Sequence, residues 1–153
     1  RNALKKVPDG AVVAIHDGVR PLLSPKLIGN MFERMDSGGV RALIPVIPSV
    51  DNLKVIVRVK HAYGNEILVS PEGENVDRSR IFGAQTPQMF LSEDIKSAYS
   101  QAFDTAFTDD ASVARKKGIP LSFCAGERYN FKLTSPEDLA LARLIISSSS
   151  RTR

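Results

Sequence analysis

The stretch Val12-Val13-Ala14-Ile15-His16-Asp17-Gly18-Val19-Arg20-Pro21 decides the fold of this chain. An apolar run ends abruptly at Asp17, turns at a glycine and presents Arg20 before Pro21 ends the strand. This pattern predicts a fully buried strand that delivers a carboxylate and a guanidinium at its carboxyl end, where open α/β sheets bind their ligands. A carboxylate there can hold a divalent cation, and an arginine can bind a phosphate. An ion pair within a turn explains the same two residues equally well.

The composition indicates a single domain with a real core. The 153 residues are 42% hydrophobic and 25% charged, as in ordinary globular proteins. No apolar stretch approaches the roughly 20 residues that a membrane span needs, and the amino end shows no signal-peptide pattern. The single cysteine, Cys124, lies in an apolar run, so we expect a buried, unreactive thiol and no internal disulfide. These features favour a cytoplasmic protein that does not bind membranes.

The charge pattern points to a small anionic ligand. A net charge of +4 is mild, the basic residues are scattered, and the chain has no tryptophan. Nucleic-acid binding usually shows a basic stripe with aromatic side chains for stacking. We therefore expect no nucleic-acid partner.

A strand–helix–strand unit surrounds the opening strand. Ser24-Pro25 is a typical helix start, apolar residues recur at helical spacing up to Met35, and Ser37-Gly38-Gly39 ends the helix. A second apolar run, Ala42 to Val46, completes the crossover unit of a parallel sheet. Residues 1–6 look like the last turns of a helix, so we expect a domain that is incomplete at its amino end.

Residues 51–80 differ from the rest of the chain. Leu53 to Val59 alternates in polarity, a turn with an exposed His61 follows, and Ile67 to Val69 forms another short strand. An isolated hairpin is marginally stable in water, so its apolar side needs a partner surface. The hairpin either packs on its own domain or is an arm that reaches another subunit.

Helices and strands alternate in the second half of the chain. We predict helices over Phe90 to Phe103, from Thr108-Asp109-Asp110 to Gly118, and after Ser135-Pro136, and strands over Ile119 to Cys124 and Tyr129 to Leu133. Helix capping explains the Thr108-Asp109-Asp110 triplet without any function. We expect the last helix to dock through Leu139 to Ile146.

Polar residues at predicted strand ends and in loops suit phosphate binding. Clusters of Cys and His, a Gly-x-Ser-x-Gly elbow and the glycine-rich phosphate motifs are all absent from the sequence. The residues that remain are Asp17, Arg20, Arg78, Thr86 and Lys132. Taken singly, each basic residue is more often a solvated surface charge.

A set of motifs in one order carries a family resemblance. They are His16-Asp17-Gly18-Val19-Arg20-Pro21, Asp77-Arg78, Gln85-Thr86-Pro87-Gln88-Met89-Phe90, Thr108-Asp109-Asp110-Ala111-Ser112, Asn130-Phe131-Lys132-Leu133-Thr134 and Pro136-Glu137-Asp138-Leu139-Ala140-Leu141-Ala142. From about Val12 to Leu144 the chain resembles the 2-C-methyl-D-erythritol 4-phosphate cytidylyltransferases of non-mevalonate isoprenoid synthesis.

The resemblance implies a fold, a reaction and partners. The fold is α/β, a Rossmann-like nucleotidyltransferase sheet, partial and mostly parallel, with a protruding β-hairpin arm. The reaction transfers CMP from CTP to methylerythritol phosphate and releases pyrophosphate in the bacterial cytoplasm. Family members use Mg²⁺ and are homodimers whose arms, here residues 51–80, cross into the neighbouring site.

The resemblance also assigns residue roles. Asp17 matches the metal-binding and catalytic aspartate, and Lys132 matches the catalytic lysine near the substrate phosphate. The matched substrate-binding residues are Arg20, Arg78, Thr86, Thr108 and Asn52. Asn52 stands where the family has a threonine in its arm, and its amide can still hydrogen-bond a hydroxyl.

The chain departs from the family at its start, where the glycine-rich loop that cradles the CTP phosphates is missing. We therefore expect residues 1–153 to form one nucleotidyltransferase domain, incomplete at its amino end and inactive alone. Two alternatives stay open: a ribitol-5-phosphate cytidylyltransferase of the same fold, and a non-catalytic dimerisation or binding module that lacks the nucleotide loop.

Overall fold

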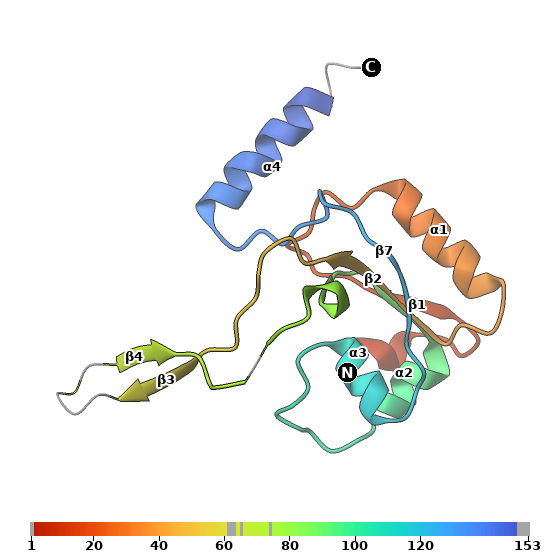
Figure 1. Cartoon of the computed structure of the whole chain (residues 1–153). Coiled ribbons are helices and arrows are strands. Elements are labelled where there is room, and N and C mark those ends of the chain that lie inside the picture. Colours follow the sequence, from red (N-terminus) through yellow and green to blue (C-terminus); the bar gives the residue numbers. More distant parts are fainter. Residues whose placement is uncertain (1, 61–63, 65, 74, 150–153) are drawn as a thin grey trace. The chain divides into compact units, whose positions relative to one another are not determined.

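The computed structural model describes residues 2–60, 64, 66–73 and 75–149 (Figure 1). It divides the chain into two compact units, which we describe separately. The first unit comprises Arg1–Ile47 and Ala84–Arg153, and the second comprises Pro48–Gly83. The predicted turn with His61 falls mainly outside the described residues.

Most of a five-stranded sheet lies in the first unit. Its strands are β1 (Val12–Ile15), β2 (Ala42–Pro48), β5 (Phe82–Ala84), β6 (Gln88–Leu91) and β7 (Ser122–Ala125). The strand order is β1-β6-β2-β5, and β7 pairs with β2 in parallel. Strand β6 runs antiparallel to both β1 and β2, so the sheet is mixed and the prediction of a mostly parallel sheet is wrong.

The physical reason is that β6 lies between the two strands of the predicted crossover unit. Strands β1 and β2 still point the same way, because each is antiparallel to β6. They are not neighbours, however, and the helix between them crosses over an intervening strand. Strand β1 is also only partly buried, which corrects the prediction of a fully buried strand.

Helices cover both faces of the sheet (Figure 1). Helix α1 (Pro25–Asp36) covers one face, and the other carries α2 (Ser92–Ala98), α3 (Asp110–Lys116) and a short 3-10 helix, η1 (Ala3–Lys6). Alternate residues of the strands serve the two faces, as the pleat of a strand requires. Leu43 and Met89 pack against α1, while Ile44 and Phe90 pack against the opposite helices.

Helix α1 begins and ends where the sequence predicts. The Ser24 hydroxyl accepts a hydrogen bond from the Leu27 N–H, Pro25 occupies the first position, and Gly38 and Gly39 follow the helix with positive φ. Glycine adopts that backbone conformation without a steric penalty.

The segment from Phe90 to Phe103 contains less helix than predicted. Residues 88–91 form strand β6, and α2 spans only Ser92–Ala98. Periodicity alone does not separate a short apolar strand from the start of a buried helix. In the structure, Phe90 pairs with Val13 on β1 and with Ala42 on β2, which fixes it in the sheet.

The predicted strand from Tyr129 to Leu133 is an irregular segment in the structure. Its backbone forms one hydrogen bond to the opening turn, from the Leu133 N–H to the Val19 carbonyl oxygen. Asn130 is fully buried, and its side-chain amide bonds the Thr86 carbonyl oxygen. Side-chain hydrogen bonds therefore replace the backbone ladder of a strand here.

Helix α4 (Pro136–Ser149) begins at the predicted cap. Asp138 accepts hydrogen bonds from the backbone and hydroxyl of Thr134 and from the Ser135 N–H. These hydrogen bonds, the Thr134 backbone bond first among them, lower the pKa of the Asp138 carboxyl.

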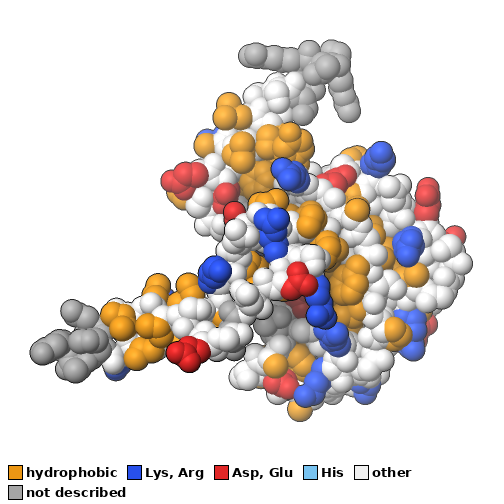
Figure 2. Space-filling view, viewed as in Figure 1, with side chains coloured by type: hydrophobic (Ala, Val, Ile, Leu, Met, Phe, Trp, Pro, Cys, Tyr) orange, Lys and Arg blue, Asp and Glu red, His pale blue; other side chains and the backbone are white. Residues whose placement is uncertain are grey.

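The prediction that the last helix docks through its apolar residues is wrong for this structure. Its exposed apolar side chains, which Figure 2 shows as an orange group on α4, include Leu139, Leu141, Leu144 and Ile146. Ala142 is buried, whereas most of the larger apolar side chains of α4 are exposed to solvent. Within the described residues, no helix is both long enough and apolar enough to cross a membrane.

The second unit contains a β-hairpin and a short 3-10 helix. Strands β3 (Val57–Lys60) and β4 (Glu66–Val69) pair antiparallel, and η2 covers Arg78–Arg80. All eight strand residues are exposed, and hydrophobic side chains are visible along the hairpin in Figure 2. The hairpin therefore lacks a core of its own.

Truncating Met31 to alanine tests the packing of α1 on the sheet. The Met31 side chain is 1% exposed, so Met31→Ala leaves a cavity and should lower the free energy of unfolding by about 2–5 kcal/mol. The measurement is urea denaturation followed by circular dichroism. Asn30→Ala, at an exposed position of the same helix, is the control and should change stability by no more than about 0.5 kcal/mol. Equal losses for the two variants would contradict the packing described here.

Candidate active site

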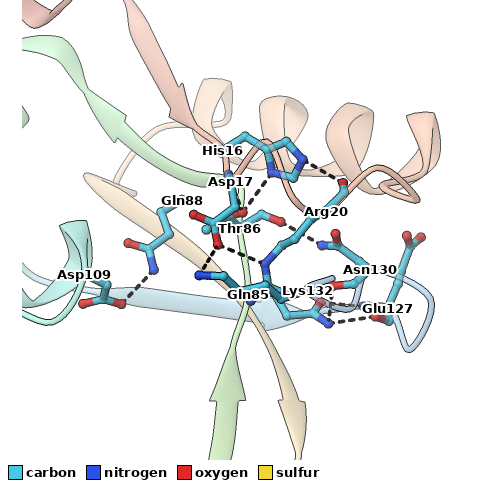
Figure 3. Close-up of polar contacts among 10 residues, drawn as sticks. All are labelled: His16, Asp17, Arg20, Gln85, Thr86, Gln88, Asp109, Glu127, Asn130 and Lys132. Carbon is cyan, nitrogen blue, oxygen red and sulfur yellow. Dashed lines mark hydrogen bonds and ion pairs between the residues drawn. The ribbon is translucent and has the colours of Figure 1, made fainter. Parts of the chain in front are cut away.

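Asp17 stands directly beyond the carboxyl end of β1 and pairs with two cations (Figure 3). Its Oδ2 atom lies 3.4 Å from Arg20 Nε and 3.5 Å from Lys132 Nζ. The two cations come from distant parts of the chain, since Arg20 follows β1 whereas Lys132 lies between β7 and α4. Asp17, Arg20 and Lys132 together therefore carry one negative and two positive charges.

The guanidinium of Arg20 is fixed by a hydrogen bond to a backbone carbonyl group. Its side chain is only 12% exposed, and Nη1 donates a hydrogen bond of 2.7 Å to the Asn130 carbonyl oxygen. Lys132 differs, because half of its side chain is exposed. The lysine ammonium is thus the more accessible of the two cations.

Thr86 and His16 complete the polar edge. The Thr86 hydroxyl oxygen accepts a 3.0 Å hydrogen bond from the Asp17 N–H and lies 2.9 Å from His16 Nδ1. The other ring nitrogen, Nε2, lies 3.1 Å from the Arg20 carbonyl oxygen. Thr86 follows β5, so this group joins the opening turn to the segment between β5 and β6.

A network of buried side-chain amides connects the loops that carry these polar residues. The Gln85 side chain, 3% exposed, donates to the Glu127 and Asn130 carbonyl oxygens and accepts from the Glu127 N–H. The Glu127 carboxylate in turn accepts from the Ser24 hydroxyl, which caps α1. Asn130 Oδ1 is buried without a hydrogen-bond partner among the described residues. The network fixes the loop that carries Lys132 to the loop that carries Thr86.

Thr108 lies at the start of α3 and is exposed. Its N–H donates to the Ser112 hydroxyl, while Asp109 caps the helix and accepts a hydrogen bond from the Gln88 side chain. In the part of the chain that the structure describes, no hydrogen bond or ion pair links Thr108 to Asp17, Arg20 or Lys132. The capping explanation of this triplet agrees with the geometry, with Asp109 as the cap.

Arg78 and Asn52 belong to the second unit, Pro48–Gly83. Arg78 Nη1 donates to the Val50 carbonyl oxygen over 3.1 Å, and Asn52 is exposed. Their predicted substrate contacts therefore stay predictions.

The carboxylates of the described residues do not gather into a metal cluster. No group of three or more His, Cys, Asp or Glu side chains is placed to hold a metal ion there. Cys124 on β7 is half-buried and not fully buried as predicted, and partial burial raises the pKa of its thiol.

Sequence reasoning assigned no role to four residues that build this site: His16, Gln85, Glu127 and Asn130. Three of them stand inside the motifs that carry the family resemblance, next to residues that were assigned a role. Their position beside predicted strand ends was the available signal. Glu127 lies outside those motifs, so nothing in the sequence pointed to it.

A substitution of Gly126 tests the network around Gln85, because the surrounding atoms leave no room for a side chain at position 126. A Cβ atom at this position would clash with Gln85 Oε1 and lie 3.2 Å from the Val46 carbonyl oxygen. Gly126→Ala should therefore destabilise the protein by about 1–3 kcal/mol in urea denaturation. Gly29→Ala is the matched control, since a Cβ there meets nothing within 4 Å, and in a helix it should stabilise by about 0.5–1 kcal/mol. The same sign for both changes would argue against a tightly packed Gln85.

Known proteins share much of this sequence and its fold. A family model described as "IspD: 2-C-methyl-D-erythritol 4-phosphate cytidylyltransferase" matches residues 1–148. Proteins with that enzyme name from Porphyromonas gingivalis and Phocaeicola vulgatus are 41% and 38% identical to the chain, over 97% and 95% of its length. The crystal structure of the Thermus thermophilus protein superposes with a TM-score of 0.74 at 28% identity, covering 94% of this chain and 65% of that one.

These similarities extend over nearly the whole chain but only part of each relative. The chain spans 61% of the Porphyromonas protein and 60% of the Phocaeicola protein. The family match covers far more than half of the present sequence. This chain belongs to the IspD family, the 2-C-methyl-D-erythritol 4-phosphate cytidylyltransferases.

Proposed function

We propose that this chain forms the sugar-phosphate side of a cytidylyltransferase site. In this reaction CMP passes from CTP to 2-C-methyl-D-erythritol 4-phosphate and pyrophosphate is released. The observation that carries the proposal is the Asp17 carboxylate with two cations, Arg20 and Lys132, at the carboxyl end of β1. Family membership supports the identity of both substrates.

This reaction requires no covalent intermediate with the protein. A phosphate oxygen of the sugar-alcohol phosphate attacks the α-phosphorus of CTP, and the bond between that phosphorus and the bridging oxygen breaks as pyrophosphate leaves. Catalysis then depends on alignment and on offsetting negative charge. A rigid, positively charged edge serves both needs.

The two cations divide the work according to their burial. Arg20 is fixed by Asp17 and by the Asn130 carbonyl oxygen, so it supplies a permanent positive charge with little freedom to move. Lys132 is more exposed, so its ammonium can leave Asp17 and pair with an incoming phosphate.

Asp17 suits Mg²⁺ in the manner of nucleotide-transferring enzymes. Mg²⁺ is commonly bound by one or two carboxylates together with substrate phosphates, and Asp17 offers one partly exposed carboxylate beside the phosphate-binding cations. When bound there, Mg²⁺ would neutralise phosphate charge and orient the reacting groups.

We propose a homodimer in which the arm, residues 51–80, completes the neighbouring site. The exposed apolar side chains of the β3–β4 hairpin support a protein partner, because an uncovered hairpin of this kind is marginally stable. In this arrangement Arg78 and Asn52 contact the substrate bound by the other subunit. Thr108 approaches the substrate from the start of α3.

The 153 residues contain no glycine-rich loop for the CTP phosphates, so we propose that this chain alone does not transfer CMP. For activity assays we propose an extended chain, which carries at its amino end a glycine-rich CTP-binding segment of the kind that the family resemblance implies. We propose that the reaction takes place in the bacterial cytoplasm.

Replacing Lys132 tests the proposed phosphate contact. In the extended chain, Lys132→Gln should reduce kcat/KM for methylerythritol phosphate by about tenfold to a hundredfold, since a charge-assisted hydrogen bond contributes about 1.5–3 kcal/mol. Pyrophosphate release is the measurement, with ribitol 5-phosphate as the competing substrate.

Lys116→Gln is the matched control, because Lys116 is also an exposed lysine paired with an aspartate, Asp104, at 3.3 Å. It should leave the rate unchanged. Equal effects of the two substitutions, or faster turnover with ribitol 5-phosphate, would count against the proposal.

Mixing two inactive variants tests the crossing arm. If Arg78 serves the partner's site, Asp17→Ala and Arg78→Ala subunits of the extended chain should form mixed dimers with one intact site. Activity should recover to about a quarter of wild type at equal mixing, because half of the dimers are mixed and each has one working site of two. No recovery, with mixed dimers confirmed by mass spectrometry, would exclude the arrangement.

A further inference from the structure

The His16 ring is hydrogen-bonded at both nitrogens within the candidate active site. Nε2 lies 3.1 Å from the Arg20 carbonyl oxygen, and Nδ1 lies 2.9 Å from the Thr86 hydroxyl oxygen (Figure 3). All three residues belong to the first unit. The direction of each hydrogen bond therefore depends on which ring nitrogen of His16 carries the proton.

The partners select one tautomer of the neutral ring. A carbonyl oxygen only accepts hydrogen bonds, so Nε2 must carry the proton that it shares with Arg20. A neutral imidazole has a single N–H, which leaves Nδ1 as an acceptor. The Thr86 hydroxyl must then donate its proton to Nδ1.

This assignment uses up the only proton that the Thr86 hydroxyl can donate. A hydroxyl has one donor and two acceptor positions. The Asp17 N–H, 3.0 Å away, occupies one acceptor position. One lone pair on the Thr86 oxygen is therefore left to accept a hydrogen bond from a ligand, and the hydroxyl has no proton left to donate to a ligand.

We propose that His16 is a positioning residue that sets the hydrogen-bond polarity of Thr86, so that Thr86 accepts a hydrogen bond from a hydroxyl of the substrate and does not donate one to its phosphate. The inference rests on the proposed function, since it takes the ligand to be a sugar-alcohol phosphate. It divides the substrate between two parts of the site: the phosphate goes to the cations Arg20 and Lys132, and a carbon-bound hydroxyl goes to Thr86. A hydroxyl is both donor and acceptor, whereas a dianionic phosphate oxygen only accepts.

Nitrogen NMR of the 153-residue chain tests the tautomer without any substrate. The chain has two histidines, so His61→Gln leaves the His16 ring as the only imidazole. Long-range proton–nitrogen correlation, recorded under conditions in which the His16 ring is neutral, should show a protonated Nε2 and a bare Nδ1. A proton on Nδ1, or averaging between the two tautomers, would overturn the inference.

Two substitutions of His16 test whether its hydrogen bond to Thr86 affects substrate binding. Each substitution keeps one of the two hydrogen bonds of the ring. His16→Asn places an amide oxygen near the Nδ1 position and can still accept from Thr86, whereas His16→Gln places an amide near Nε2 and keeps only the Arg20 contact. In the extended chain, His16→Gln should raise KM for methylerythritol phosphate by about tenfold, the effect of one lost hydrogen-bond constraint, with a smaller change in kcat. His16→Asn should restore KM to within about threefold of wild type.

The readouts separate this inference from the proposed function. Equal unfolding free energies of the two variants in urea exclude a merely structural effect, and equal KM values for them would overturn the inference. If the wild-type extended chain transfers no CMP at all, the proposed function fails, while the NMR result still decides which group donates between His16 and Thr86.

Discussion

The hydrogen bond from the Arg20 guanidinium to the Asn130 carbonyl oxygen joins the parts of the site. It connects the turn after β1 to the loop before α4, and the Asn130 side chain extends the connection to the Thr86 carbonyl oxygen. A guanidinium on a mostly buried side chain needs such partners, because an unpaired buried charge is costly. Three segments distant in sequence are thereby held at one edge of the sheet.

The same logic explains why uncharged amides surround the charged residues. Gln85 and Asn130 are almost completely buried and bond to backbone groups of neighbouring loops. Amides satisfy buried carbonyl and N–H groups without adding charge, so the electrostatics are left to Asp17, Arg20 and Lys132. A rigid set of hydrogen-bonded side chains next to the charged residues is a suitable arrangement for aligning a phosphate.

Part of this arrangement could be predicted and part could not. Capping patterns located α1 and the start of α4, because a serine, a proline or a paired glycine acts through neighbouring residues alone. The order of motifs singled out Asp17, Arg20, Thr86 and Lys132, and the structure brings all four together. Their action on a substrate stays a prediction. The antiparallel strand β6 and the irregular segment around Asn130 escaped prediction, since both depend on partners far away in the chain.

By itself the sequence determined the caps of α1 and α4, the apolar runs of β1 and β2 and the residue types capable of phosphate chemistry. These features follow from short-range periodicity and side-chain chemistry. Only the tertiary structure decided that β6 lies between β1 and β2, that the lysine of a distant loop shares the Asp17 carboxylate, and that His16 lies within hydrogen-bond distance of the Thr86 hydroxyl. The physical reason is that hydrogen bonds and ion pairs depend on distances of a few ångströms between atoms, which sequence separation does not specify.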